Sequence, residues 1–323
     1  MSDHSTSTDL SSHHGHQKTI RIGTRDSELA LWQANTVSKK LNDLGYTTQI
    51  ISVKSTGDLI LDQPLYELGI TGIFTKTLDI AMLNGEVDIA VHSMKDVPTS
   101  LPKGIVEAAV LERANVYDLL VHKGNLNFLK SEGIIATGSL RRKAQWLHRY
   151  PNHQIVDLRG NVNTRMQKLH DNLWNGAIFA QAGLERINIK PETVEVLDWM
   201  IPAPAQGAMM VVAMEQDDFC REALAKLNHE PTQMATHIER DFLKTLEGGC
   251  TAPIGALVKI VDDSIYFTGT LHALDGSKKI EIKNVFSIKE AIGLGQKIAF
   301  EVLNNGGSEL MIEIRKSLAL KEK

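Results

Sequence analysis

The chain has 323 residues, of which 42% are apolar and 23% charged, and its net charge is −4. This length predicts two or three domains, and the composition is typical of a globular protein. No apolar run approaches the length of a membrane span, the slightly acidic balance argues against general nucleic-acid binding, and two cysteines give no disulfide framework. Because the N-terminus also lacks a secretory signal pattern, we expect a cytoplasmic protein in a reducing compartment.

Residues 1–17 form a polar segment that contains His4, His13, His14 and His16. Such a segment cannot bury enough apolar surface to order itself, so we expect a disordered tail. Weak binding of a transition metal by the histidines is the alternative.

Strands and helices alternate from residue 18 onward. Strands are predicted at 18–24, 47–54 and 87–93, and helices at 27–45, with Ser27 as its N-cap and Gly45 at its end, and at 73–85. The pattern then restarts, with strands at 118–123, 134–138, 154–159 and 177–183 and helices at 139–150 and 161–176. This alternation predicts an α/β fold with mostly parallel sheets in two domains.

The remaining chain predicts a third, smaller domain. Residues 201–218, rich in proline and small residues, return to a strand and are expected to cross between domains. A long helix over 232–249 precedes three alternating strands at 254–261, 264–273 and 278–286, with helices from 288 onward. We therefore expect an α+β domain at the C-terminal end of the chain.

Basic and hydroxyl side chains, with one carboxylate, gather where the predicted strands end. They are Arg25, Ser27, His92, Ser93, Lys95, Asp96, Thr137, Ser139, Arg141, Arg142, Arg159, Arg165 and Arg186. Ligands of open α/β sheets bind at these ends. Residues 137–168 hold seven Lys or Arg against one acid, Asp157. This predicts a cleft for a ligand with many carboxylates or phosphates, because arginine forks pair with such groups; a solvated basic face is the alternative.

The segment LEGGCTAP, residues 246–253, places Cys250 directly after two glycines. Either the glycines only end a helix and Cys250 fills a gap, or a large group approaches its sulfur. His92 and His237 are interpreted as hydrogen-bonded structural histidines, and Cys220 as part of the core. The sequence contains no metal-site, P-loop or nucleophile-elbow signature.

Six segments together carry a resemblance to a known family. They are RIGTRDSELALWQA, VDIAVHSMKDVP, GSLRRKAQ, LRGNVNTR, PAPAQGAM and LEGGCTAPIGA. Over residues 18–260 the chain resembles the hydroxymethylbilane synthase, or porphobilinogen deaminase, family. It departs from the family's pattern in the loops STGD (55–58), ITGIF (70–74) and RANVYDL (113–119), and in ATGSLRR (136–142).

The resemblance implies a tetrapyrrole-pathway enzyme. Such an enzyme joins four porphobilinogen molecules head to tail with loss of ammonia, and then releases 1-hydroxymethylbilane. It also implies a dipyrromethane cofactor bound as a thioether to Cys250, no metal, and a monomer. The implied fold is two periplasmic-binding-protein-like α/β domains plus a smaller C-terminal α+β domain. The implied boundaries are 18–112 with 207–226 for the first domain, 117–202 for the second and 231–323 for the third.

The resemblance also assigns roles to individual residues. Asp96 is the implied catalytic residue. The implied cofactor-binding residues are Cys250, Ser93, Lys95, Thr137, Ser139, Arg141, Arg142 and Arg165. The implied substrate-binding residues are Arg25, Ser27, Arg159, Arg186, Gln206 and Gly207.

Two other functions compete with this interpretation. A two-lobed protein that only binds anions would use the same fold and arginines, but it has no need of Cys250. A thiol enzyme would use Cys250 as a nucleophile in each turnover. The predicted helix ends just before Cys250, and the negative end of a helix dipole disfavours a thiolate, so a permanent thioether is the better interpretation.

Overall fold

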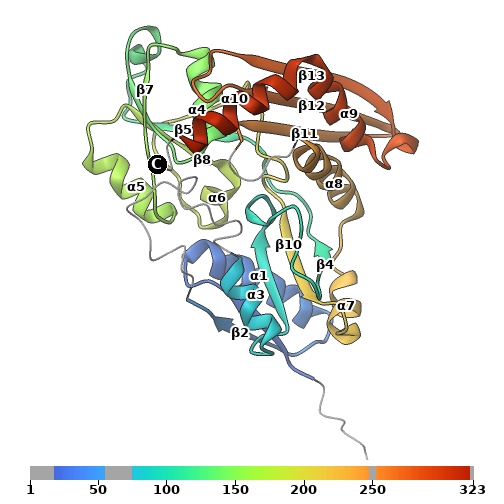
Figure 1. Ribbon diagram of the computed structural model, residues 1–323. Coiled ribbons are helices and arrows are strands. Elements are labelled where there is room, and N and C mark those ends of the chain that lie inside the picture. Colours follow the sequence, from blue (N-terminus) through green and yellow to red (C-terminus); the bar gives the residue numbers. More distant parts are fainter. Residues whose placement is uncertain (1–17, 55–74, 247–251, 321–323) are drawn as a thin grey trace, which may run out of the picture.

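The structure is a computed structural model that describes residues 18–54, 75–246 and 252–320. In these residues three β-sheets, each with its own helices, occupy three regions of the molecule (Figure 1). The α/β fold with a smaller C-terminal α+β part, predicted from the sequence, is confirmed, but the two five-stranded sheets are mixed rather than mostly parallel.

The first sheet has the strand order β2-β1-β3-β10-β4. Its strands are β1 (Ile20–Thr24), β2 (Thr48–Ser52), β3 (Ile89–Ser93), β4 (Ile105–Val110) and β10 (Met209–Met214). β1 pairs in parallel with β2 and β3, whereas β10 runs antiparallel to β3 and β4. β10 is the strand that follows residues 201–208, so the predicted crossing between domains is confirmed.

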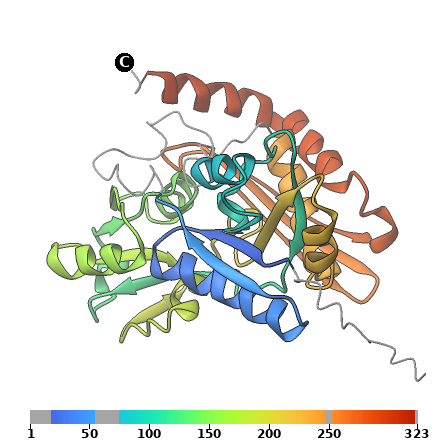
Figure 2. The ribbon, with the colours of Figure 1, turned by 90° about the horizontal axis from the view of Figure 1, so that it is seen from below.

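Helices cover both faces of the first sheet, and Figure 2 shows them on either side of it. They are α1 (Glu28–Asp43), α3 (Lys76–Leu83) and α7 (Asp218–Ala225). α1 begins at the predicted N-cap, since the Ser27 side chain accepts a hydrogen bond from the Ala30 amide at 3.4 Å. On one face of the sheet, Val37 and Leu41 of α1 pack in the same core as Val91 of β3. Ala90, the residue before Val91, points to the other face and packs in the core that contains Leu78 of α3.

The second sheet repeats the topology of the first, with the order β7-β6-β8-β5-β9. Its strands are β5 (Asp118–His122), β6 (Ile134–Ala136), β7 (Gln154–Val156), β8 (Gly176–Ala180) and β9 (Val194–Val196). Its helices are η3 (Asn127–Lys130), α4 (Leu140–Arg149), α5 (Val162–Asp171) and α6 (Gln181–Arg186). β6 lies parallel to β7 and β8, and β5 runs antiparallel to β8 and β9. The residues 181–183, predicted as strand, instead begin the short helix α6.

The third sheet is an antiparallel meander, as predicted. It consists of β11 (Ile254–Val261), β12 (Ser264–His272) and β13 (Lys279–Ser287), with helices α8 (Glu230–Thr245), η4 (Ile288–Glu290), α9 (Leu294–Val302), η5 (Leu303–Gly307) and α10 (Ser308–Ala319). Phe242 of α8 and Phe267 of β12 meet edge to face in its core, with ring centroids 5.1 Å apart.

Helix α8 contacts the third sheet and both segments that connect the first and second sheets. Its fully buried Glu239 accepts hydrogen bonds from both Nη atoms of Arg113 at 2.7 and 2.9 Å. The same carboxylate accepts from the backbone amides of Ala205 and Val258, each at 2.7 Å. Arg113 and Ala205 lie on the two segments that connect the first and second sheets, and Val258 lies on β11. One carboxylate therefore fixes both connecting segments against the third sheet.

Candidate active site

The strand β3 delivers Asp96 and Lys95 to its carboxyl end. The single turn η2 (Met94–Asp96) follows Ser93 directly, and Met94 is fully buried. Ser93 accepts a hydrogen bond from Nε2 of the buried Gln33 at 2.8 Å. Asp96 is exposed, and its carboxylate has no hydrogen bond or ion pair among the described residues. The turn therefore presents a free carboxylate beside a lysine.

Two predicted cofactor-binding arginines share a carboxylate that the sequence analysis missed. Arg141 Nη2 donates to Asp118 Oδ2 at 2.8 Å, and Arg142 Nε and Nη2 donate to Asp118 Oδ1 at 3.1 and 2.7 Å. All three side chains are buried. Burial alone would raise the pKa of Asp118, but Arg141, Arg142 and Lys95 outweigh it and hold this pKa well below its usual range. The two guanidinium groups are therefore partly neutralised within the protein, although the Arg141 Nε has no hydrogen-bond partner among the described residues.

Gln206 connects this pair of arginines to Lys95. Its Nε2 donates to Asp118 Oδ1 at 2.9 Å, and its Oε1 accepts from Lys95 Nζ at 3.2 Å. The Gln206 side chain is fully buried. Gly207, at φ 88°, packs so closely that a Cβ there would lie 2.6 Å from the Ala114 carbonyl oxygen. Both residues are enclosed by the protein itself, and their contact with substrate stays a prediction.

Lys95 and Arg165 carry charge in half-buried surroundings. Burial, together with the neighbouring Arg142 and Arg141, lowers the pKa of Lys95 to about 8, whereas Asp96 and Asp118 oppose the shift. Burial likewise lowers the pKa of Arg165 to about 10, with contributions from Arg142, Arg159 and Arg25. These interactions show that the structure brings together basic residues from β1, β3, α4, α5 and the end of β7, as predicted from the strand ends.

The turn before α4 is shaped by small residues. The Thr137 hydroxyl accepts from the Ser139 amide at 3.3 Å, and the Ser139 hydroxyl accepts from the Arg142 amide at 3.4 Å as the N-cap of α4. A Cβ on Gly138 would lie 2.7 Å from the Leu158 carbonyl oxygen, so only glycine fits. Thr137 and Ser139 thus orient the helix that carries Arg141 and Arg142.

Arg186 lies apart from this cluster. Its Nη2 donates to the Gly207 carbonyl at 2.6 Å, and its guanidinium lies 5.6 Å from the centre of the Trp32 ring. Burial lowers the pKa of Arg186 to about 10. Arg186, Trp32 and Lys40 line a separate groove of about 490 Å³ between α1 and α6.

The remaining candidates have mixed outcomes. Cys220 is fully buried in the first core, as predicted, and His237 bonds Glu107 at 2.8 Å, also as predicted. His92 is buried, but its Nε2 has no hydrogen-bond partner in the described part of the chain, so the prediction of a hydrogen-bonded histidine is wrong for this atom there. Burial and Arg25 lower the pKa of His92 to about 4, so its ring is neutral. No group of three or more His, Cys, Asp or Glu in the described ranges could hold a metal.

Cys250 lies outside the described residues, as do residues 1–17, 55–58 and 70–74. The chain on its C-terminal side is described. The Ala256 amide of β11 donates to the Pro202 carbonyl at 3.0 Å, and the preceding Ile201 carbonyl accepts from Arg141 Nη1 at 2.8 Å. The strand that follows Cys250 therefore begins beside the buried arginines.

The charges of the cluster fit a ligand with several carboxylates. The basic side chains of the cluster are Arg25, Lys95, Arg141, Arg142, Arg159 and Arg165, and among the described residues the carboxylates of Asp96 and Asp118 lie near them. Desolvated cations are costly unless they are paired, so an anionic ligand would stabilise this arrangement.

Comparisons with known proteins agree with this chemistry. The family model "Porphobilinogen deaminase, dipyromethane cofactor binding domain" matches residues 20–222, and "Porphobilinogen deaminase, C-terminal domain" matches residues 234–304. The chain is 39% identical to a porphobilinogen deaminase of Chloroherpeton thalassium, covering 93% of this chain and 98% of the relative. It is 41% identical to the chloroplastic enzyme of Pisum sativum, covering 89% and 82%.

Among solved structures, the chain overlays an ancestral cationic amino acid solute binding protein with a TM-score of 0.42 and 14% identity, covering 65% of this chain and 87% of that chain. No helix in the described parts of the chain is long and apolar enough to cross a bilayer.

Proposed function

The chain belongs to the porphobilinogen deaminase family, and on this premise we propose how its residues divide the work of the reaction. The enzyme is a hydroxymethylbilane synthase that acts in tetrapyrrole biosynthesis and carries a dipyrromethane cofactor. It condenses four porphobilinogen molecules with loss of ammonia. Water then releases the linear product.

Asp96 is the proposed catalytic residue, and its free carboxylate at the end of β3 is the observation that carries this proposal. When porphobilinogen loses ammonia, the carbon–nitrogen bond of its aminomethyl group breaks and the pyrrole ring becomes positively charged. A fixed carboxylate beside the ring accepts a hydrogen bond from the pyrrole N–H and stabilises the positive charge. Because no described residue occupies the carboxylate of Asp96, it is available for this role.

The basic cluster is proposed to hold the acetate and propionate groups. Each porphobilinogen ring adds two carboxylates, so the demand for cations grows with the chain. Lys95, Arg141, Arg142 and Arg165 would bind the carboxylates of the cofactor, with Ser93, Thr137 and Ser139 shaping the two turns. Arg25, Arg159 and the N-cap residue Ser27 would serve the incoming substrate. For Arg186, which lies in the groove with Trp32, the proposed role is a more distant substrate contact.

Gln206 and Gly207 receive a different proposed role. The Gln206 amide holds Lys95 and Asp118 in place, and Gly207 lets its own segment pack against the Ala114 carbonyl. We therefore assign both residues to positioning rather than to substrate contact.

Cys250 is proposed to carry the cofactor through a thioether. When bound, the dipyrromethane supplies the free pyrrole carbon to which the first porphobilinogen is joined. Two described features support this placement. Residue 252 leads into β11, which packs against the Ile201–Pro202 backbone, and Arg141 donates to Ile201. In the sequence, Gly248 and Gly249 directly precede Cys250, and they have no side chains that could hinder a bulky group.

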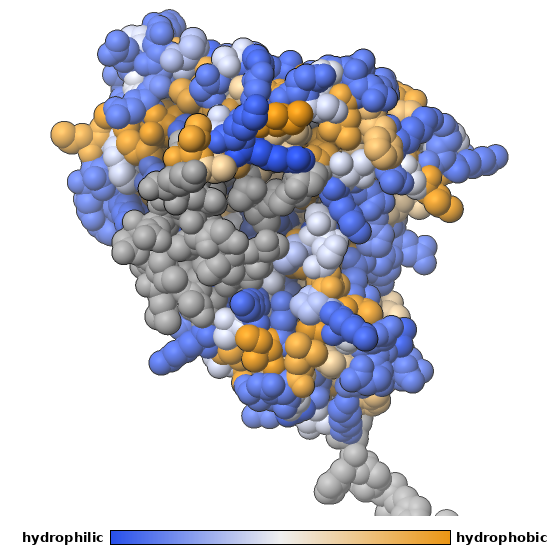
Figure 3. Space-filling view, viewed as in Figure 1, coloured by the Kyte–Doolittle hydropathy of each residue, from blue (hydrophilic) through white to orange (hydrophobic). Residues whose placement is uncertain are grey.

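A monomer in the cytoplasm is proposed for the assembly and the location. Exposed apolar residues on the face shown in Figure 3 form separate groups between charged ones, rather than one broad patch. The domain boundaries given above stay a prediction.

The test of this assignment is Asp96→Asn, which keeps the shape but loses the charge. Removing one electrostatic stabiliser of a transition state costs roughly 10²–10³ in rate, so we expect turnover to fall by at least about a hundredfold with the cofactor still attached. Single-turnover loading of porphobilinogen, followed by mass spectrometry of the protein, measures the elongation rate. Asp96→Glu, which keeps the charge, should retain part of the activity.

Glu86→Gln is a matched control, since Glu86 carries an exposed carboxylate just before the N-terminal end of β3, whereas Asp96 follows the C-terminal end. It should elongate at the rate of the unmodified enzyme. Elongation by Asp96→Asn at that same rate would make Asp96 structural and refute its catalytic role.

A further inference from the structure

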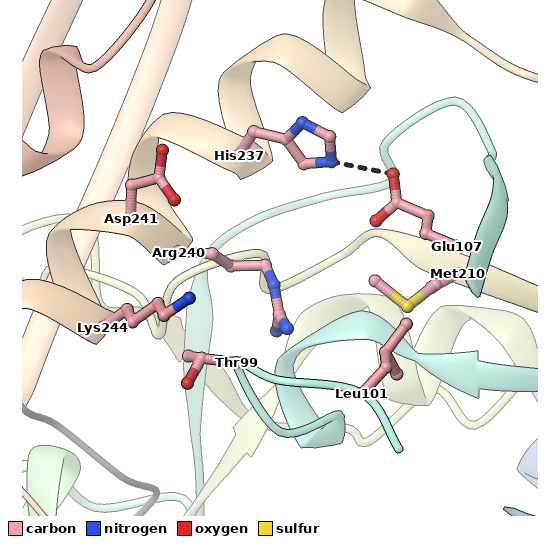
Figure 4. Close-up of a pocket in the computed structure, with 8 residues that line it drawn as sticks. All are labelled: Thr99, Leu101, Glu107, Met210, His237, Arg240, Asp241 and Lys244. Atoms are coloured by element: carbon pink, nitrogen blue, oxygen red, sulfur yellow. Dashed lines mark hydrogen bonds and ion pairs between the residues drawn. The ribbon is translucent and has the colours of Figure 1, made fainter. Parts of the chain in front are cut away.

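Arg240 of α8 reaches the turn that carries the catalytic carboxylate. Its Nη1 donates to the Met94 carbonyl at 3.1 Å and to the Val97 carbonyl at 2.9 Å, and its Nη2 donates to the Pro98 carbonyl at 2.7 Å. These carbonyls bracket Lys95 and Asp96 on both sides. Figure 4 shows the guanidinium extending from α8 toward the segment of Thr99 and Leu101.

The turn has little internal support of its own. η2 is three residues long, and the Val97 amide donates to the Met94 carbonyl at 3.2 Å. Short 3₁₀ segments have poor hydrogen-bond geometry and leave carbonyls unpaired at their ends. Charge-assisted bonds from a guanidinium are shorter and stronger than neutral ones, so three of them fix these carbonyls firmly.

Helix α8 provides a rigid base for Arg240. The preceding residue, Glu239, is fully buried and bonded to Arg113, Ala205 and Val258. α8 ends at Thr245, five residues before Cys250. The same helix is therefore connected to the turn of Asp96 and to the segment that contains the cofactor cysteine.

We propose that Arg240 is a positioning residue for the deaminase reaction: by bonding the carbonyls of Met94, Val97 and Pro98, it fixes the carboxylate of Asp96 relative to α8. Arg240 acts through the backbone. This inference rests on the proposed catalytic role of Asp96. Misplacement of a reacting group by about 1 Å can cost roughly 10²-fold in rate, so the loss of three bonds to this turn should be visible in turnover.

The surroundings of Arg240 allow a sharp test. The side chain crosses a groove of about 290 Å³ that is lined by Leu101, Glu107, Met210, His237, Asp241 and Lys244. Removal of the side chain beyond Cβ leaves room for ethylguanidinium, which matches the missing atoms. Lys244 lies one turn further along α8 on the same groove, is exposed, and makes no hydrogen bond to the described residues of the turn, so Lys244→Ala is the matched control for loss of a positive charge.

The experiment uses the full-length holoenzyme. For Arg240→Ala we expect kcat to fall at least about tenfold, KM to change less than about threefold, and the cofactor mass to remain. Ethylguanidinium in the millimolar range should restore kcat at least about threefold in Arg240→Ala, and should leave the unmodified enzyme and Lys244→Ala unchanged. Arg240→Lys can still reach one or two carbonyls, so its kcat should lie between those of Arg240→Ala and the unmodified enzyme. It also provides the test of the inference if Arg240→Ala does not fold.

A double-mutant cycle separates positioning from a purely structural role. If Arg240 acts through Asp96, then Asp96→Asn combined with Arg240→Ala should be no slower than Asp96→Asn alone. Multiplied losses in the double variant, or an unchanged kcat in Arg240→Ala and Arg240→Lys, would overturn the inference. Full activity of Asp96→Asn by itself would instead refute the proposed function, so the two failures are distinguishable.

Discussion

Replacing Asp118 by Asn should destabilise the protein through the arginines that it holds. The carboxylate has a side chain with no exposed surface and accepts four hydrogen bonds, two from Arg142 and one each from Arg141 and Gln206. Asn keeps the size but removes the negative charge, and its NH₂ group would face guanidinium donors. Arg141 and Arg142 would then repel each other without compensation in the interior.

The magnitude follows from the burial of all three groups. Removing one partner of a buried ion pair costs about 3–5 kcal/mol, because a charge is left uncompensated. For large chains about 1 kcal/mol shifts Tm by roughly 2–4 °C, so we expect Tm at pH 7 to fall by about 10 °C. The same geometry fixes Lys95 through Gln206, so the fraction of molecules that carry cofactor should also fall.

The pH dependence gives a second test. The pKa of Asp118 is depressed in the folded protein, so its stabilising contribution is present above the unfolded value of about 4 and is lost as the pH falls toward the folded value. The Tm difference between the two proteins should therefore be full at pH 7 and shrink below pH 4.

The assay is thermal unfolding with intact mass analysis at each pH. Asp262→Asn, a change at an exposed turn residue, is the control for loss of one negative charge and should shift Tm by less than about 2 °C. A Tm for Asp118→Asn within 2 °C of the unmodified enzyme at pH 7, with full cofactor content, would refute this account of the buried arginines.

Three further predictions follow from other parts of the chain. Because the pKa of Lys95 is lowered to about 8, its positive charge is present below that pH and lost above it, so cofactor assembly by the apoprotein should slow from pH 7 to 9. Lys95→Arg should remove this pH dependence. An equal decline of the assembly rate in that variant would contradict the assignment. Phe242→Ala should lower the free energy of unfolding by about 3–5 kcal/mol, measured by denaturant titration, because Phe242 is fully buried against Phe267. Deletion of residues 1–16 should leave Tm and turnover unchanged, and a large loss of either would show that the tail is more than a polar extension.

The elements with strong periodicity were predictable from the sequence. The helices α1 and α8 and the three strands of the meander lie where the spacing of apolar residues indicates. The short edge strands β4 and β9 were missed, and β9 has only three residues, VEV, which is too short for its alternation to be recognised. Residues 181–183 of helix α6 were predicted as strand because QAG directly continues the buried strand β8.

The candidate site was predictable in its charges but not in its pairing. Arginines at several strand ends indicated an anion-binding cleft, and the structure brings most of them together. That Asp118 neutralises two of them depends on contacts between distant segments. One signal was present, since an acid at the head of the apolar strand LLV must have a buried partner. For Arg240 the sequence offers no comparable signal, because its partners are backbone carbonyls.

Intact mass spectrometry of the full-length protein during reaction with porphobilinogen tests the central claim most directly. The account predicts a resting mass that exceeds the sequence mass by two linked pyrrole units, localised to the peptide that contains Cys250. Porphobilinogen should add a ladder of further units, each without one ammonia, and Cys250→Ser should show neither the resting excess nor the ladder. A protein that turns over porphobilinogen at its bare sequence mass would contradict the account.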